Sequence, residues 1–207
     1  EAVYREQANG SRIFGHRWVD TDSKSRITCQ DFKKFGKDDN AQTHCPTPST
    51  YANNCFDFIA VDRGYNVIAI DAVSAFLHAA EQNEFCFMEP PQEWLDRMGE
   101  KATGMIWRLV GNLYGRRTAG SQFRDLWEAL VCSCPGMEMI RGHHEPFGYY
   151  CKKTDCLTVH QVDDGRITGT HETELSQGMH EPTEGHMKNL TRLGRCLVGK
   201  VGRSTAG

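Results

Sequence analysis

The sequence lacks an apolar run long enough to cross a lipid bilayer. No stretch of the 207 residues approaches the roughly 18 consecutive apolar residues that such a helix needs, and the N-terminus has no apolar signal core. We therefore expect an intracellular protein, cytoplasmic or nuclear, that makes no contact with a membrane. The opening segment, EAVYREQANGSRIF, is typical of the interior of a longer chain.

The sequence also lacks an excess of positive charge. Its formal net charge is −3, so any contact with nucleic acid must come from local basic patches rather than from the protein as a whole. Charged residues make up 25% of the chain and the apolar share is ordinary, which is typical of a globular protein rather than a disordered one. The length fits one domain or two small ones, and no internal repeat is present.

The nine cysteines lack the regular spacing of a disulfide framework, and their number is odd. One group has the chemistry of a zinc site, because Cys132 and Cys134 precede the pair His143 and His144. The CxC spacing differs from that of the usual zinc knuckle, however, and Cys132 falls in a helical pattern. The alternative, which this spacing favours, is a set of scattered reduced thiols in an intracellular protein.

Hydrophobic periodicity and turn residues predict the secondary structure of the first half. The predicted elements are a basic hairpin or strand pair over 17–34, a loop over 36–50, a helix over 51–63, a strand over 65–71 and a short helix or turn over 72–82. The strand over 65–71, YNVIAID, is short, rich in β-formers and preceded by Gly64, which favours a buried strand over a helix.

The second half continues as a mixture of strands and helices. We expect a strand within 85–95 closed by Pro90 and Pro91, a strand over 105–115, a helix over 119–134 with Ser121 as N-cap, two strands within 147–162, a hairpin turn at 163–165 and a helical face over 183–200. The turn is expected there because Gly165 tolerates a positive φ. The order of elements predicts an α+β fold rather than a regular βαβ series.

Carboxylates occur at the end of one predicted strand and at the tip of one predicted hairpin. Asp71 ends the strand over 65–71, and Asp163 and Asp164 lie in the turn of TVHQVDDGRITGT. Magnesium prefers hard oxygen ligands, and two such ions activate an attacking hydroxyl and stabilise a leaving pyrophosphate. The residues alone leave two interpretations open: an acidic turn surrounded by water, which is the commoner case, or half of a metal site.

Four blocks of sequence, in order, resemble a known family. They are IDAVSAFLHA, FMEPPQEW, WRLVGNLYGRRTAGSQFRDLW and VHQVDDGRITG, and together they resemble the reverse transcriptase of copia-type (LTR) retrotransposon Pol polyproteins. Upstream, KSRITCQDF and HCPTPS are similar to fingers segments of that family. The resemblance covers about residues 17–170. It implies the fingers and part of the palm of a right-hand polymerase, with an antiparallel palm sheet and packed helices.

The resemblance assigns roles to particular residues. It implies that Asp71 and Asp163 are the principal ligands of Mg²⁺ (or Mn²⁺), with Asp164 completing the acidic set. It also implies that Phe76 lies beneath the sugar of the incoming nucleotide and excludes a 2′-hydroxyl. The periodicity by itself favours an ordinary core phenylalanine at that position. Two further residues, His78 and Trp127, are expected to be packing residues.

The resemblance also implies a set of nucleotide-binding residues outside the acidic set. Lys24 and Arg26 match the basic pair of the fingers that faces the incoming triphosphate, while the alternative is solvated charge on a hairpin. The segment from Gly115 through Arg117 to Ser121 matches the part of the family that lies beneath the templating base and the nucleotide.

The chain departs from the family pattern in three places. Gln161 replaces an aromatic residue, which weakens stacking near the primer end, and Thr118 to Gly120 replace a glutamine-serine-proline pattern. The segment 175–200 resembles a region that normally lies far downstream, approaching the ribonuclease H domain. Only about five residues, 171–175, separate the two regions here. We therefore expect an internally deleted copy that lacks the thumb.

These observations predict three regions and two competing functions. The expected regions are a fingers-like part over 1–64, a palm with the acidic site over 65–170 and a displaced helical segment over 171–207. The first hypothesis is an RNA-directed DNA polymerase that uses an RNA template, a DNA primer and deoxynucleoside triphosphates in a pathway that leads to DNA integration. The rest of a Pol polyprotein is its expected partner. The second is an inactive remnant with at most weak binding of nucleic acid or protein.

Overall fold

The computed structural model describes residues 1–31, 43, 45, 47–72, 74–81, 86–134, 136–145 and 147–170, together with the backbone of 197–200. The chain divides into two units, and each consists of two stretches of sequence: 1–43 with 79–122, and 44–78 with 123–207. These boundaries differ from the expected ones at 64 and 170. The reason is strand pairing, because the N-terminal strands pair with strands from 86–108 rather than with their neighbours in sequence.

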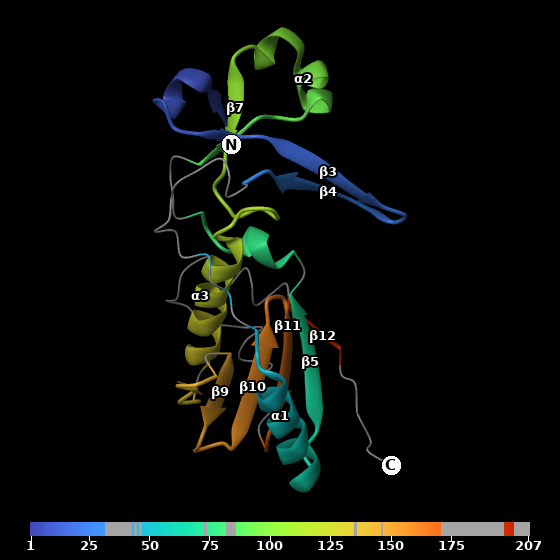
Figure 1. The fold of residues 1–207 in the computed structure, drawn as a ribbon, viewed down its shortest axis with the longest axis vertical. Helices are drawn as coiled ribbons and strands as arrows, with labels where there is room; N and C mark the ends of the chain where they lie inside the picture. The colour runs from blue at the N-terminus through green and yellow to red at the C-terminus, as the bar shows by residue number, and fades with distance from the viewer. Residues whose placement is uncertain are drawn as a thin grey trace. The chain divides into compact units, whose positions relative to one another are not determined.

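The first unit contains a four-stranded sheet with the order β1-β7-β6-β2, of which Figure 1 labels β7. Its strands are β1 (Ala2–Tyr4), β7 (Met105–Arg108), β6 (Phe87–Met88) and β2 (Ile13–Phe14). The helices of this unit are η1 (Arg5–Ala8), α2 (Gln92–Met98) and η4 (Gly99–Ala102). Buried apolar side chains from β2, β6 and the residues beside them form its core, including Phe14, Met88 and Leu109.

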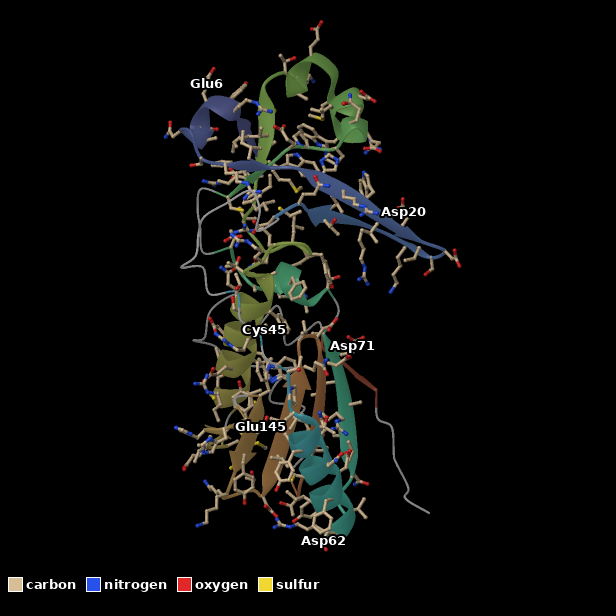
Figure 2. All side chains as sticks on the ribbon, in the orientation of Figure 1. Glu6, Asp20, Cys45, Asp62, Asp71 and Glu145 are labelled. Carbon is tan, nitrogen blue, oxygen red and sulfur yellow. The ribbon has the colours of Figure 1, made fainter. Side chains whose placement is uncertain are left out.

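The first unit also carries the predicted basic hairpin. Strands β3 (His16–Thr21) and β4 (Lys24–Cys29) pair antiparallel from His16–Cys29 to Thr21–Lys24. Most of its side chains are exposed, and Figure 2 labels Asp20 toward the tip. The expectation of a strand pair in this region is confirmed. Most of the loop predicted over 36–50 lies outside the described residues.

The second unit is built on a six-stranded antiparallel sheet with the order β12-β5-β11-β10-β9-β8. In chain order, its strands are β5 (Val67–Ala72), β8 (Ile140–Arg141), β9 (Gly148–Cys151), β10 (Cys156–Gln161), β11 (Asp164–Thr168) and β12 (Leu197–Lys200). The strand predicted over 65–71 is therefore confirmed as β5. Its side chains alternate, with Ile68, Ile70 and Ala72 buried.

Two helices cover opposite faces of this sheet. Arg166 of β11 donates hydrogen bonds to Asp57 and Asn53 of α1 (Thr50–Asp62), and the adjacent Gly165 lies against Trp127 of α3 (Ala119–Cys132). Because consecutive residues of a strand point to opposite faces, α1 and α3 lie on different sides. Both helices were predicted, and both are confirmed. The boundary between the two units falls inside α3.

Two local predictions are wrong. Ser121 is not the N-cap of α3, because the helix begins at Ala119 and the buried Ser121 hydroxyl donates to the carbonyl of Thr118 within the first turn. The helical face predicted for the C-terminal segment also fails at Leu197, where the backbone forms β12 and pairs with β5. Edge pairing with a sheet replaces helical hydrogen bonding there. The rest of 171–207 lies outside the described residues.

Candidate functional site

The acidic hairpin tip is a two-residue turn between β10 and β11. Gln161 and Asp164 form the last cross-strand pair, so Val162 and Asp163 make the turn. Val162 has φ of +56°, while Gly165 lies inside β11. The expected turn at 163–165 is therefore displaced toward the N-terminus. A positive φ is costly for a β-branched residue, so the surrounding hairpin must hold Val162 in this conformation.

The sheet register brings the three predicted metal-binding aspartates together. Asp71 of β5 and Asp164 of β11 are direct partners in the antiparallel ladder, and so their side chains share one face. Asp163 lies beside them in the turn, and its carbonyl accepts a hydrogen bond of 2.9 Å from the backbone N–H of Ala72. Asp71 and Asp164 are exposed, and Figure 2 labels Asp71 near the end of β5. The carboxylates therefore come from separate strands and meet at one end of the sheet.

The electrostatics of this end are those of mutually repelling carboxylates. Partial desolvation, followed by the charges of Asp163 and Asp71, raises the pKa of Asp164 above its ordinary value. A divalent cation would relieve this repulsion, and the donors are the hard oxygens that Mg²⁺ prefers. Among the residues that the structure describes, however, no group of three or more His, Cys, Asp or Glu side chains is arranged closely enough to hold a metal ion. Asp71, Asp163 and Asp164 therefore have the donor chemistry that Mg²⁺ prefers, but the described arrangement does not group their side chains as a three-residue metal site.

Aromatic packing on the α3 face fixes the hairpin. A Cβ atom on Gly165 would lie 2.9 Å from two atoms of the Trp127 ring, so this close approach requires glycine. The buried ring of His160, the cross-strand partner of Gly165, stacks on Trp127 with a centroid distance of 4.9 Å. Burial lowers the pKa of His160 to about 3, so the imidazole is neutral at physiological pH. Trp127 and His78 are both buried, as packing residues are.

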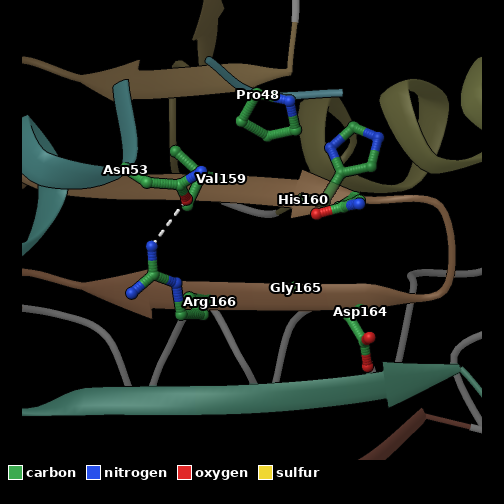
Figure 3. Close-up of a pocket in the computed structure, with 8 residues that line it drawn as sticks. Pro48, Asn53, Val159, His160, Asp164, Gly165 and Arg166 are labelled. Carbon is green, nitrogen blue, oxygen red and sulfur yellow. Dashed lines mark hydrogen bonds between the residues drawn. The ribbon is translucent and has the colours of Figure 1, made fainter. Parts of the chain in front are cut away.

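A pocket of about 120 Å³ opens on the α1 side of the hairpin. Figure 3 shows Asn53 of α1 accepting a hydrogen bond from Arg166, and the side chain of Asp164 extending toward β5. The lining comes from the segment before α1, α1 itself, β10 and β11: Pro48, Asn53, Val159, His160, Gln161, Asp164, Gly165 and Arg166. Asp164 is therefore the one of the three aspartates that borders this pocket.

Phe76 belongs to the same unit as the aspartates. It lies in the short 3₁₀ helix η3 (Ala75–His78), five residues after Asp71, and it is half-buried. Its ring meets that of Phe123 edge to face, with centroids 6.2 Å apart. This contact is what the packing interpretation expects, and the partial exposure leaves part of the ring available to a ligand.

The remaining predicted nucleotide-binding residues lie in the first unit. Lys24 and Arg26 are exposed on β4, and Arg26 lies over the Tyr114 ring at 5.1 Å from its centroid. Gly115, with φ of +87°, and Arg117 follow Tyr114 directly. The structure thus joins β4 to the segment 114–117. The structure separately places Asp71, Asp163 and Asp164 close to one another along the second sheet. The basic group belongs to the first unit, and the three aspartates belong to the second.

Sequence reasoning missed Asp31, a buried carboxylate next to this segment. Its side chain accepts hydrogen bonds from Arg116 and Arg117, which lie more than 80 residues away in the chain. Asp31 lies in the block KSRITCQDF and within the hairpin predicted over 17–34, but neither pattern indicates a role or a partner for its carboxylate. The partners are set by tertiary structure alone.

The zinc alternative receives no support from the described cysteines. The thiol of Cys132 donates to the carbonyl of Met139, and that of Cys134 donates to the carbonyl of Leu130. Burial raises the pKa of Cys134 to about 12, so the metal-free thiol is protonated at neutral pH. His143 and His144 instead contact each other edge to face.

Comparison with known proteins identifies no relative. The chain matches no family model, no curated protein and no solved structure. None of the helices within the described residues is both long and apolar enough to cross a membrane.

Proposed function

We propose that this chain is the reverse transcriptase domain of a copia-type retrotransposon polyprotein, an RNA-directed DNA polymerase. One observation carries the proposal: antiparallel pairing sets Asp71 directly opposite Asp164, with Asp163 in the adjoining turn. Nucleotidyl transfer with two metal ions requires carboxylates from separate strands that converge at one end of a sheet. Under this proposal the acidic hairpin is part of a metal site, and the pairing of Asp164 with a carboxylate from another strand supports it.

The acidic residues would hold the ions and the other predicted residues would hold the nucleotide. Asp71, Asp163 and Asp164 supply oxygen ligands for Mg²⁺ or Mn²⁺. When bound there, these ions activate the primer 3′-hydroxyl toward the α-phosphate and stabilise the departing pyrophosphate. Phe76 would lie under the deoxyribose, where its ring leaves no space for a 2′-hydroxyl.

The basic residues of the first unit would bind the triphosphate. Lys24 and Arg26 extend from an exposed strand, and Arg117 follows the glycine of the neighbouring segment. Their positive charges attract phosphate oxygens, which the near-neutral protein as a whole does not. The substrates are an RNA template with a DNA primer and deoxynucleoside triphosphates, and the rest of a Pol polyprotein is the proposed partner.

Primer extension on an RNA template tests this proposal. The wild type is compared with Asp163→Asn and with Asp125→Asn, in the presence of Mg²⁺ or Mn²⁺. Asp125 is a matched control, because its exposed carboxylate on α3 pairs only with the adjacent Arg124 among the described contacts. We expect extension by the wild type and by Asp125→Asn, and its loss in Asp163→Asn. Equal extension by all three chains would exclude the metal-site interpretation.

A second candidate function is that of an inactive remnant with weak binding of nucleic acid or protein. Two observations favour it: the described residues contain no ready-made group of three metal-binding side chains, and the distant segment Leu197–Lys200 pairs with the strand of Asp71. A polymerase without its thumb also loses phosphate contacts that hold the duplex. This candidate predicts binding of a primer–template without any extension, and the same assay separates it from the first.

A further inference from the structure

A buried ionic cluster lies beneath the proposed triphosphate-binding surface of the first unit. The carboxylate of Asp31 accepts hydrogen bonds from Arg116 Nη1 at 2.7 Å, from the Arg117 backbone N–H at 3.2 Å and from Arg117 Nε at 3.3 Å. Arg12 adds an ion pair at 3.8 Å. The side chain of Asp31 is only 3% exposed, and that of Arg116 is 7% exposed. One carboxylate thus binds three arginines.

The same cluster continues on the other side of Arg116. Its Nε donates to Glu81 at 3.0 Å, and its guanidinium group lies over the Phe14 ring at 4.8 Å from the centroid. The Glu81 side chain is only 1% exposed. Arg116 is therefore held on several sides, and its orientation is fixed by hydrogen bonds and by stacking.

Backbone contacts join the segment 114–117 to the end of β4 at Cys29, two residues before Asp31. The backbone N–H of Cys29 donates to the Tyr114 carbonyl at 2.7 Å. A Cβ atom on Gly115 would lie 2.1 Å from the Cys29 carbonyl oxygen, so only glycine fits between the two chains. Asp31 follows Cys29 by two residues, and its carboxylate accepts the hydrogen bonds from Arg116 and Arg117. The contacts therefore run without a break from Tyr114 to Arg117.

A buried ion pair is weak evidence for stability, because the cost of removing the charges from water offsets most of their attraction. What such a pair does supply is a fixed geometry. Here the fixed parts are the two stretches that carry Lys24 and Arg26 on one side and Gly115 and Arg117 on the other.

We infer that Asp31 is a positioning residue, which holds Arg117 and its segment against β4 so that the two basic stretches form one surface for the triphosphate of a deoxynucleotide. This inference rests on the proposed function, which assigns the triphosphate to these residues. Asp31 itself is buried, and its carboxylate is paired with arginine side chains. It acts through the side chain and backbone N–H of Arg117.

Binding of a deoxynucleoside triphosphate tests this role without requiring catalysis. Fluorescently labelled dATP with Mg²⁺ is titrated by anisotropy against the full chain, its Asp31→Asn variant and its Asp31→Glu variant. The control is Glu89→Gln, which breaks the exposed pair of Glu89 with Arg5 in the same unit. Circular dichroism and gel filtration check the fold. Should Asp31→Asn fail to fold, the triple variant with Glu81→Gln and Arg116→Gln removes the buried charges together.

We expect Asp31→Asn to raise the dissociation constant for dATP between about tenfold and 100-fold, since small displacements of positioning groups have effects of this size. Asp31→Glu should recover part of the affinity, and Glu89→Gln should bind as the wild type does. In primer extension, Asp31→Asn should raise KM for the nucleotide more than it lowers kcat, whereas a merely structural role would reduce the active fraction and leave KM unchanged.

The dATP-binding assay and the primer-extension assay together separate this inference from the proposed function. Binding that depends on Asp31 in a chain that extends no primer supports the positioning role while the polymerase proposal fails. Unchanged binding by a folded Asp31→Asn chain, or by the triple variant, overturns the positioning role whatever the extension assay shows. A wild-type chain that binds no dATP overturns it as well.

Discussion

Removing the charge of Asp164 should stabilise the protein when no divalent cation is present. Asp164 and Asp71 are direct cross-strand partners, so their Cβ atoms are about 4.5–5.5 Å apart. Two charges at about 4 Å repel by about 1 kcal/mol in water, and both side chains are exposed, so salt and rotation of the carboxylates weaken the effect. Asp164→Asn should therefore raise the free energy of unfolding by between a few tenths and about 1 kcal/mol. For a chain of this size, 1 kcal/mol corresponds to about 2–4 °C in Tm.

The same variant should respond less to magnesium. A cation present at ten times its dissociation constant stabilises the folded chain by about 1.4 kcal/mol, and the variant has lost one charged ligand. Thermal unfolding is followed by circular dichroism in EDTA and in MgCl₂. We expect Asp164→Asn to have the higher Tm in EDTA and the wild type to gain more from Mg²⁺. A variant that is no more stable in EDTA, or equal gains from Mg²⁺, would refute the shared acidic site.

The pH dependence of this difference follows from the raised pKa of Asp164. The folded chain holds the proton of this carboxyl to a higher pH than the unfolded chain does, so Asp164 contributes stability at low pH that is lost as the pH rises from about 3.8 through the raised pKa. The advantage of Asp164→Asn should thus be full at pH 7 and shrink as the pH falls toward 4. An advantage that is constant over this range would contradict the proposed repulsion.

Three further predictions concern the hairpin and Phe76, the residue proposed to lie beneath the sugar. Val162→Gly should leave stability unchanged or raise it by up to about 1 kcal/mol in urea unfolding, because relief of the positive φ exceeds the entropy cost of glycine; a clear loss would contradict the turn geometry. Gly165→Ala should lower stability by about 1–3 kcal/mol through its clash with Trp127, and Trp127→Phe should restore part of this loss; an unaffected Gly165→Ala chain would show that α3 packs elsewhere. Phe76→Ala should increase incorporation of ribonucleotides relative to deoxynucleotides, and an unchanged ratio would assign Phe76 to the core contact with Phe123 alone.

Local patterns predicted most elements but not their partners. The run YNVIAID predicted β5, and the helical spacing of Phe123, Leu126 and Trp127 predicted α3, since each signal lies within a few adjacent residues. Which strand lies beside β5 depends on contacts across about 90 residues. The pairing of Asp71 with Asp164 was therefore beyond the reach of periodicity.

In the acidic site, too, the sequence indicated the residues but not which of them would be paired. The resemblance indicated Asp71, Asp163 and Asp164 as a set, with Asp163 as the principal partner of Asp71. In the sheet, Asp164 is the direct partner, while Asp163 lies in the turn. The sequence suggested that the positive φ belongs to Gly165, but packing against Trp127 determines the need for glycine there. Either a positive φ or close packing can account for a glycine, and only the structure shows that packing is the reason at position 165.

The role of Asp31 could not be predicted, because Arg116 and Arg117 lie more than 80 residues away in the chain and the ion pair with Arg12 also joins separate parts of it. The resemblance placed the segment from Gly115 to Ser121 beneath the templating base and the nucleotide, whereas Arg116 within it is buried and pairs with Asp31 and Glu81. A buried charge becomes recognisable only once its counter-charge is in place.

The most direct test of the central claim is single-turnover incorporation of one deoxynucleotide onto a primer annealed to RNA, with wild type, Asp71→Asn and the control Asp125→Asn in Mg²⁺. If carboxylates from two strands form one catalytic site, the wild type and the control incorporate the nucleotide at similar rates, and Asp71→Asn is at least about 100-fold slower. Equal rates for the wild type and Asp71→Asn, or no incorporation by a folded wild-type chain that binds the primer–template, would contradict the account.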